Sequence, residues 1–223
     1  MKKIAKLTLV LLLIANCTVA QKRISIKKIE SRLITNEGVE FVGTLRDKNN
    51  DHYMFPKWNN NGVLFVDRKM YGIGNINFNI TTNSVDSRIT QDKLFMFQSS
   101  SVDSVSINNR LFKRVGTLLY EVLFEGQNNA LLKKYDIRYE DGYEGRTGVG
   151  ANQGPSQTSV VFKYVVVKPG KRMENIELNK KSILEIFENE SDILVGYAKK
   201  EHLSFRKEED IVKMLSFLAT SSS

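Results

Sequence analysis

The apolar residues of this chain change their spacing once, and that change decides the class of fold. From about Val39 to Lys168 they recur at every second position in short runs, which is the period of a half-buried β-strand. After about Asn179 they recur every three or four residues, which is the period of an amphipathic helix. The sequence therefore predicts an α+β fold. An N-terminal antiparallel β-sheet, a sandwich or a partial barrel, precedes three short C-terminal helices packed on it.

The strand prediction depends on five runs rich in β-branched and aromatic residues. They are residues 62–67, 93–98, 117–126, 130–139 and 159–168. Residues 126–129, Gly-Gln-Asn-Asn, predict a hairpin turn between the third and fourth runs. In the third run, alternation places Glu121 on the more polar face. Leu119 and Leu123 share that face, so it is expected to be partly covered as well.

Three segments after Asn179 have helical spacing, and each is too short to be stable alone, so they must dock on the sheet or on each other. Their apolar stripes are Ile183, Ile186 and Phe187, then Ile193, Leu194, Tyr197 and Ala198, then Ile211, Met214, Leu215 and Leu218. Residues 208–210 are all acidic and precede the third stripe, where the helix dipole favours negative charge.

The first twenty residues have the layout of a secretory signal. Three lysines precede the apolar run at residues 7–15, and a small-residue triplet ends at Ala20, so we expect cleavage between Ala20 and Gln21. The apolar run is about half the ~20 residues needed to span a bilayer. We therefore expect a periplasmic or secreted protein without a transmembrane helix in its mature form. The alternative is a lipid anchor at Cys17, which Asn16 disfavours because lipoprotein processing needs a small residue there.

Cys17 is the only cysteine, so a chain that begins at Gln21 has no thiol and no disulfide. Such an exported protein must be held together by its hydrophobic core, and about 200 residues can build one. Thiol nucleophiles, redox pairs and cysteine metal sites are excluded for that mature chain.

We expect four segments along the chain. They are a signal peptide at 1–20, a basic N-terminal segment at 21–38, an antiparallel β region at 39–178, and a helical segment of the same domain at 179–220. Within the β region, residues 141–159 contain five glycines and predict a flexible hairpin loop, the segment best suited to become ordered on a partner.

The positive charge does not indicate a nucleic-acid partner. The formal charge of +8 falls to +5 without the three leader lysines, and +4 of that lies in residues 21–32. A nucleic-acid binder usually concentrates basic residues on the element that contacts phosphate. Here the basic stretch is a chain end, for which we expect a solvated, frayed N-terminus.

Only one segment resembles a metal loop, and we expect no cofactor. Asp47, Asn49 and Asp51 occupy the first three ligand positions of an EF-hand loop. His52 then stands where that loop needs glycine, and Trp58 where it needs a bidentate glutamate. The pattern therefore favours a hairpin turn, because Asn and Asp stabilise turns through their own side chains.

No motif indicates catalysis. His52 and His202 are the only histidines and lie in different regions, and the G-x-S-x-G motif of a nucleophile elbow is absent. Asp136 and Glu140 would lie about 13 Å apart along a strand, beyond the roughly 5–9.5 Å that glycosidases use. We therefore expect a protein that is not an enzyme.

Four residues remain as binding or modification candidates. Trp58 and Tyr53 could stack on a sugar ring if exposed, although large aromatic side chains more often plug the core. Arg146, within the glycine-rich loop, could bind a carboxylate or phosphate. Ser104 follows Asp103 and precedes Val105, which resembles a short O-glycosylation acceptor pattern.

Two regions together resemble a group of uncharacterised secreted or envelope proteins of Bacteroidota-type bacteria. The residues that carry the resemblance are Tyr53, Trp58, Gly62, Val63, Tyr71, Asn77 and Lys180-Lys181-Ser182. It implies compartment and topology, and no activity. The sequence thus favours an exported, non-catalytic binding or structural protein whose partner is an envelope protein or glycan. A small apolar-ligand binder with a barrel cavity is the alternative, and a glycan or peptide hydrolase is third.

Overall fold

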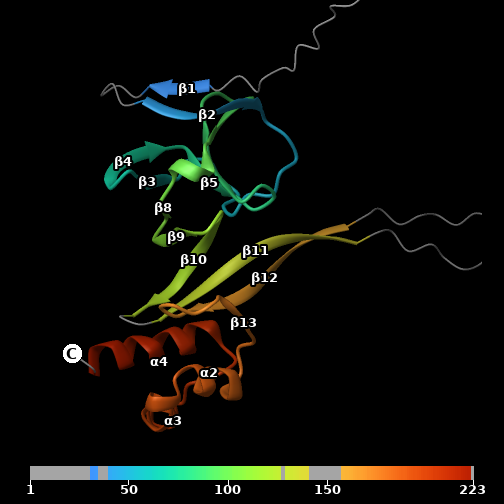
Figure 1. Cartoon of the computed structure of the whole chain (residues 1–223). Coiled ribbons are helices and arrows are strands. Elements are labelled where there is room, and N and C mark those ends of the chain that lie inside the picture. The colour runs from blue at the N-terminus through green and yellow to red at the C-terminus, as the bar shows by residue number, and fades with distance from the viewer. Residues whose placement is uncertain (1–30, 35–39, 127–128, 141–156, 222–223) are drawn as a thin grey trace, which may run out of the picture. The chain divides into compact units, whose positions relative to one another are not determined.

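The computed structural model describes residues 31–34, 40–126, 129–140 and 157–221, which belong to one compact unit (Figure 1). The strands are β1 Ser31–Ile34, β2 Glu40–Asp47, β3 Asn61–Val66, β4 Lys69–Gly74, β5 Ile76–Asn79, β6 Ser84–Arg88, β7 Lys93–Phe97, β8 Ser104–Ile107, β9 Arg110–Val115, β10 Leu118–Glu125, β11 Ala130–Glu140, β12 Gln157–Val167 and β13 Glu174–Ile176. The helices are α2 Lys180–Ile186, α3 Ser191–Lys200 and α4 Glu208–Ser221, with short 3-10 turns η1 Ser99–Ser101 and η2 Glu188–Glu190.

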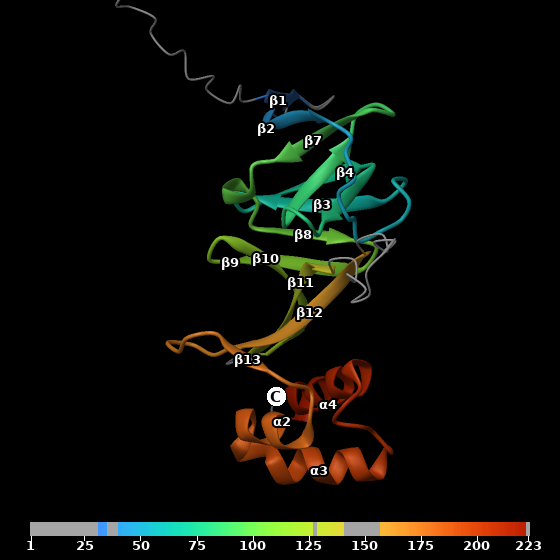
Figure 2. The same cartoon turned by 90° about the vertical axis from the view of Figure 1, so that its right-hand side faces the viewer.

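The strands form two antiparallel sheets, which confirms the predicted α+β class. One sheet has five strands in the order β1-β2-β7-β6-β5, and the other has eight in the order β13-β12-β11-β10-β9-β8-β3-β4. The neighbouring strands β8 to β12 of the larger sheet can be followed in Figure 2. Neighbours along the chain mostly pair, as short turns between antiparallel strands require. Neither sheet closes on itself, so each has two edge strands.

The two sheets share one hydrophobic core, which we call the sandwich core. Phe78 of β5 stacks on Phe112 of β9, with ring centroids 4.4 Å apart, and this contact joins the two sheets. The buried residues of the sandwich core are Phe41, Leu64, Ile73, Ile76, Phe78, Ile80, Val85, Phe95, Phe97, Val102, Val105, Ile107, Phe112, Leu119 and Tyr135. These residues come from both sheets, as in a β-sandwich.

The three helices enclose a second core, which we call the helical core. Asn179 begins α2 as an N-cap, because its side-chain oxygen accepts from the backbone N–H of Ser182 at 2.9 Å. The buried residues are Leu131, Val166, Ile183, Phe187, Leu194, Ala198, Ile211, Met214, Leu215 and Leu218. The helix prediction is therefore confirmed, with one correction. Ile193 is 51% exposed, since α3 turns the neighbouring Leu194 inward instead.

The hairpin of β11 and β12 connects the two cores. Tyr135 belongs to the sandwich core, while Leu131, four residues earlier on the same strand, belongs to the helical core. The two strands pair over eleven residues, from Ala130 opposite Val167 to Glu140 opposite Gln157. One continuous pair of strands thus contributes side chains to both regions.

Three details differ from the sequence-based expectations. Ser31–Ile34 forms β1 and pairs with β2, so the basic segment at 21–38 is not frayed over those four residues. Residues 157–159 belong to β12 and not to a loop, because they continue its pairing with β11. The pairing of β10 with β11 shifts between Val122 and Phe124, a β-bulge that strict alternation did not predict. No helix in the described part of the chain is long and apolar enough to cross a membrane.

Candidate functional site

The predicted aromatic site lies inside the protein. Trp58 is 9% exposed, and its ring meets that of Tyr53 edge-on at 4.8 Å between centroids. The Arg88 guanidinium lies 5.8 Å from the indole centroid. Trp58 is therefore a buried core residue, the placement that the sequence favoured over an exposed stacking platform.

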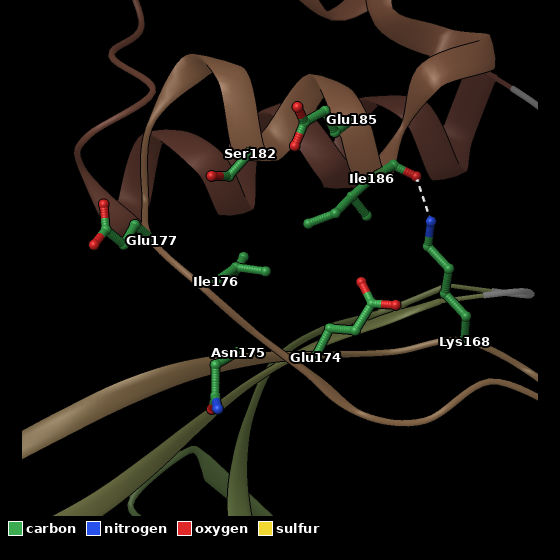
Figure 3. A pocket seen from close by; sticks show the side chains of 8 residues that line it. All are labelled: Lys168, Glu174, Asn175, Ile176, Glu177, Ser182, Glu185 and Ile186. Carbon is green, nitrogen blue, oxygen red and sulfur yellow. Dashed lines mark hydrogen bonds between the residues drawn. The ribbon is translucent and has the colours of Figure 1, made fainter.

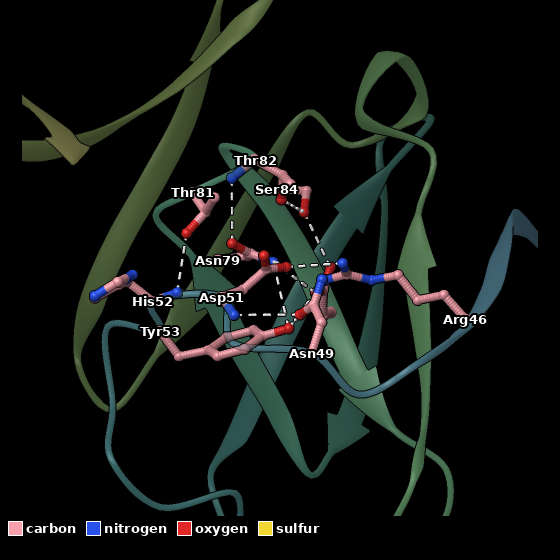
Figure 4. A network of polar contacts seen from close by, with 10 residues as sticks. Arg46, Asn49, Asp51, His52, Tyr53, Asn79, Thr81, Thr82 and Ser84 are labelled. Carbon is pink, nitrogen blue, oxygen red and sulfur yellow. Dashed lines mark hydrogen bonds and ion pairs between the residues drawn. The ribbon is translucent and has the colours of Figure 1, made fainter. Parts of the chain in front are cut away.

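Tyr53 instead joins a buried polar network that we call the Asp86 cluster: Arg46, Asp51, Tyr53, Asn79, Ser84 and Asp86 (Figure 4). Asp86, on β6, is completely buried. Its Oδ2 accepts from Tyr53 Oη at 2.8 Å, from Asn79 Nδ2 at 3.0 Å and from Arg46, while its Oδ1 accepts from Ser84 Oγ at 2.9 Å. A buried carboxylate needs such partners, because an unpaired charge in the interior is costly.

The calcium candidates do not converge on one point. Asp51 turns inward, where its Oδ2 lies 2.7 Å from Arg46 Nη1 and accepts from Asn79 at 2.8 Å. Asp47 pairs with Lys93 at the surface, and Asn49 accepts from the backbone N–H of Asp51 at 3.3 Å. Within the described ranges, no three His, Cys, Asp or Glu side chains gather as a metal site.

The protonation states of the Asp86 cluster are held by its own contacts. Burial alone would raise the pKa of Asp51, but hydrogen bonds from Asn79 and Arg46 outweigh it and lower that pKa. Burial and the nearby Asp86 carboxylate raise the pKa of the Tyr53 phenol well above its ordinary value. The cluster therefore holds the Tyr53 phenol in its neutral form and the Asp51 carboxylate in its charged form.

Sequence reasoning missed a second buried group: Arg110, Glu121 and Tyr135. Arg110 forms a two-pronged contact with Glu121, Nε to Oε1 at 2.6 Å and Nη2 to Oε2 at 2.7 Å. Tyr135 Oη donates to Glu121 Oε2, and these hydrogen bonds lower the pKa of Glu121 although burial opposes them. The sequence did contain one indication of this group. Glu121 shares its predicted face with two leucines, and a charge on a covered face requires a partner.

Three hollows lie beside β13, α2 and η2. The first, about 330 Å³, is bordered by glutamates and by Lys168, whose Nζ donates to the Ile186 carbonyl at 2.9 Å (Figure 3). A second, about 460 Å³, lies along α2 and η2 at Leu184 and Glu188. The third, about 510 Å³, we call the β13 hollow. It is lined by Phe162, Lys163, Tyr164, Asn175, Ile176, Glu177 and Leu178.

The β13 hollow opens where the sheet loses its outermost strand. β13 pairs with β12 only at Tyr164, Val165 and Val166, and the chain then leaves the sheet to begin α2. Over residues 157–163, no described strand pairs with the outer side of β12. We call this stretch the free edge of β12.

Apolar side chains accompany that free edge. The register places Phe162 opposite Tyr135, Val160 opposite Ile137 and Thr158 opposite Tyr139, so alternate residues of both strands share one face, which we call the hairpin face. On it, Val160 is 45% exposed, Phe162 49% and Tyr139 68%. A strand edge that no described strand covers, beside exposed apolar side chains, is typical of a surface that accepts another strand.

The other sheet edges are shorter or partly covered within the described structure. Beside β5, the segment from His52 to Met54 supplies backbone hydrogen bonds at 2.8 and 2.9 Å. β1 is four residues long and β13 is three, and the six-residue β4 contains two glycines, which weaken a strand. The free edge of β12 has one charged residue, Lys163, and two β-branched valines.

Comparisons with protein-family models, curated proteins and solved structures found no match to this chain. Its own geometry therefore has to carry a functional proposal. Of the remaining sequence candidates, Ser104 is half-buried in β8, opposite Phe65 and Lys113. Arg146, Ala20, Gln21 and Cys17 lie outside the described residues.

Proposed function

We propose that the protein is an exported, non-catalytic binding or structural component of the bacterial envelope. It contacts its partner through the free edge of β12 and the hairpin face. The observation that carries this proposal is the seven-residue stretch of β12 that has no outer neighbour among the described strands and is bordered by Val160, Phe162 and Tyr139. Strand addition to such an edge gives affinity through main-chain hydrogen bonds and specificity through alternate side chains.

We infer export from the leader at residues 1–20. We infer the absence of catalysis from the hydrogen-bond partners of the two buried carboxylates. Asp86 and Glu121 are each held by an arginine and a tyrosine, so neither carboxylate is free to act as an acid or base. An apolar-ligand barrel has less support, because both sheets are open. A hydrolase would need an accessible pair of carboxylates, and these two are buried.

The proposal is tested by crosslinking on intact cells of the native host, with crosslinked partners identified by mass spectrometry. Val160→Lys adds a charge to the free edge at a position that is already half exposed, so the fold should tolerate it. We expect crosslinks to fall about ten-fold or more, because an introduced lysine on an edge strand blocks pairing.

The matched control is Ile193→Lys, which adds the same charge at an exposed apolar residue of α3. We expect its crosslinks to equal those of the unmodified protein. Equal crosslinking by both variants would refute the proposed surface. Turnover of a glycan or peptide substrate that is lost with a specific acidic pair would refute the absence of catalysis.

A further inference from the structure

We propose that the partner at the free edge of β12 is a second copy of this chain, whose own β12 pairs antiparallel and continues the eight-stranded sheet across a two-fold axis. This inference rests on the function proposed above, since it names the occupant of the same surface. Two-fold dimers are the commonest symmetric assemblies, and they require a surface that is complementary to itself. Three properties of β12 meet that requirement.

The first property is length, which selects one register. β13 occupies the outer side from Tyr164 onward, and β12 begins at Gln157, so seven positions in each copy have no partner strand within the described ranges. Residues directly opposite each other in an antiparallel pair point to the same face, so a two-fold axis must pass between two identical residues. Only the register centred on Val160 uses all seven positions. Axes through neighbouring residues leave part of the edge unpaired.

The second property is charge. In the register centred on Val160, Gln157 lies opposite Lys163, Thr158 opposite Phe162, and Ser159 opposite Val161. Lys163 is the only charged residue of β12, and in this register it faces an uncharged amide. No like charges are brought together within the paired strands, so nothing in β12 itself opposes pairing with its copy.

The third property is the position of the apolar side chains. The even-numbered residues of both copies lie on the hairpin face, so the two Val160 side chains meet at the axis with a Phe162 on either side. These residues are 45% and 49% exposed in the single chain, and pairing would cover them. Cross-strand pairs of β-branched and aromatic residues are favourable on one sheet face. The shared stripe would join the hairpin faces of two molecules.

Self-pairing through seven residues per copy buries less accessible surface than the roughly 1,200–2,000 Å² that stable protein complexes bury. We therefore expect a weak dimer, with a Kd on the order of 10–100 μM, that assembles where the protein is concentrated. Its formation is measurable by sedimentation velocity across that concentration range, with protein exported and processed by its own leader.

The decisive experiment is a charge swap at the two-fold axis. Val160→Lys and Val160→Asp each place like charges opposite each other, so each variant alone should be monomeric. An equimolar mixture places lysine opposite aspartate, and we expect it to dimerise at least about ten-fold more tightly than either variant alone. Circular dichroism of each variant verifies that the fold is intact. Ile193→Lys, on α3, should dimerise as the unmodified protein does.

Three outcomes would overturn the inference: an unmodified protein that stays monomeric at about 500 μM, single variants that still dimerise, or a mixture that does not. Failure here is distinguishable from failure of the proposed function. If the unmodified protein is monomeric yet Val160→Lys still loses its envelope crosslinks, the free edge binds a different partner and only this inference falls. If crosslinks are also unchanged, both proposals fall.

Discussion

The sandwich core and the helical core are stabilised in different ways. The sandwich contains two buried ionic groups, one centred on Asp86 and the other on Glu121, each tied to an arginine and a tyrosine from other parts of the chain. The helical core is aliphatic and aromatic, and its polar contacts lie at its border. There Glu208 of α4 accepts from Lys133 at 2.7 Å and from Tyr164 at 2.8 Å.

This difference shows what fixes the strand register in the sandwich and the helix positions in the helical region. The Asp86 cluster joins β2, β5, β6 and the segment after β2, so any change in strand register would leave a buried charge without a partner. Within the described residues, the helices enclose no comparable buried ionic group and are positioned mainly by side-chain packing, with polar contacts such as those of Glu208 at the border. We expect polar substitutions to damage the sandwich most and cavity-forming substitutions to damage the helical region most.

The largest expected effect is Arg46→Met, which leaves Asp86 buried without its cation. Removing one partner of a buried ion pair costs about 3–5 kcal/mol of unfolding free energy. The measurement is urea denaturation followed by the fluorescence of Trp58, the sole tryptophan. The control is Lys93→Met, which breaks an exposed pair with Asp47 and should cost less than about 1 kcal/mol. Equal costs would show that the Asp86 cluster does not hold the sandwich.

The next effect is Leu215→Ala in the helical core, where the side chain is fully buried. The cavity should cost about 2–5 kcal/mol. We expect the helical signal in far-UV circular dichroism to be lost at lower urea than the Trp58 signal, because the damage is confined to the helices. Ile193→Ala, at an exposed residue of α3, should stay within about 0.5 kcal/mol. Coincident loss of both signals would mean that the two regions unfold as one.

Low pH should destabilise the sandwich region more than the helical region, by less than the two substitutions above. The pKa values of Asp51 and Glu121 are lowered in the folded state from ordinary values of 3.8 and 4.5. Their contribution to stability is therefore full above those values and is lost as pH falls through the folded pKa values, below about pH 4. Both carboxylates lie in the sandwich region. We expect urea midpoints reported by Trp58 to fall below about pH 4 more steeply than those reported by helical circular dichroism; parallel curves would contradict this.

The smallest effect is Glu208→Gln, at the junction of α4 with the hairpin. An amide oxygen can still accept from Tyr164 and Lys133, so only the charge is lost, at a cost of about 1 kcal/mol. The pKa of Tyr164, which burial and Glu208 raise, should fall toward its ordinary value in this variant. Spectrophotometric titration of the tyrosines measures that change. An unchanged titration curve would show that Glu208 does not influence the phenol.

Local pattern was sufficient to predict the elements. The alternation in 117–126 and 130–139 became β10 and β11, and the stripe from Ile211 to Leu218 became the buried face of α4. Pattern failed where a residue depends on a distant partner. Glu121 alternates as a solvent-facing acid should, yet it is buried because Arg110 lies eleven residues earlier on the neighbouring strand. Asp51 resembles a calcium ligand, yet its partner is Arg46.

The order of residues therefore determined the fold class, the point where strands end and helices begin, and the absence of any cysteine after Cys17. These follow from spacing and composition, which act over a few residues. Tertiary structure alone decided which charges are buried together, that Trp58 is enclosed, and that no described strand flanks the outer side of β12 over residues 157–163. The free edge exists because β13 ends after three residues. No local pattern reveals which strands become neighbours, since pairing depends on how the whole chain packs.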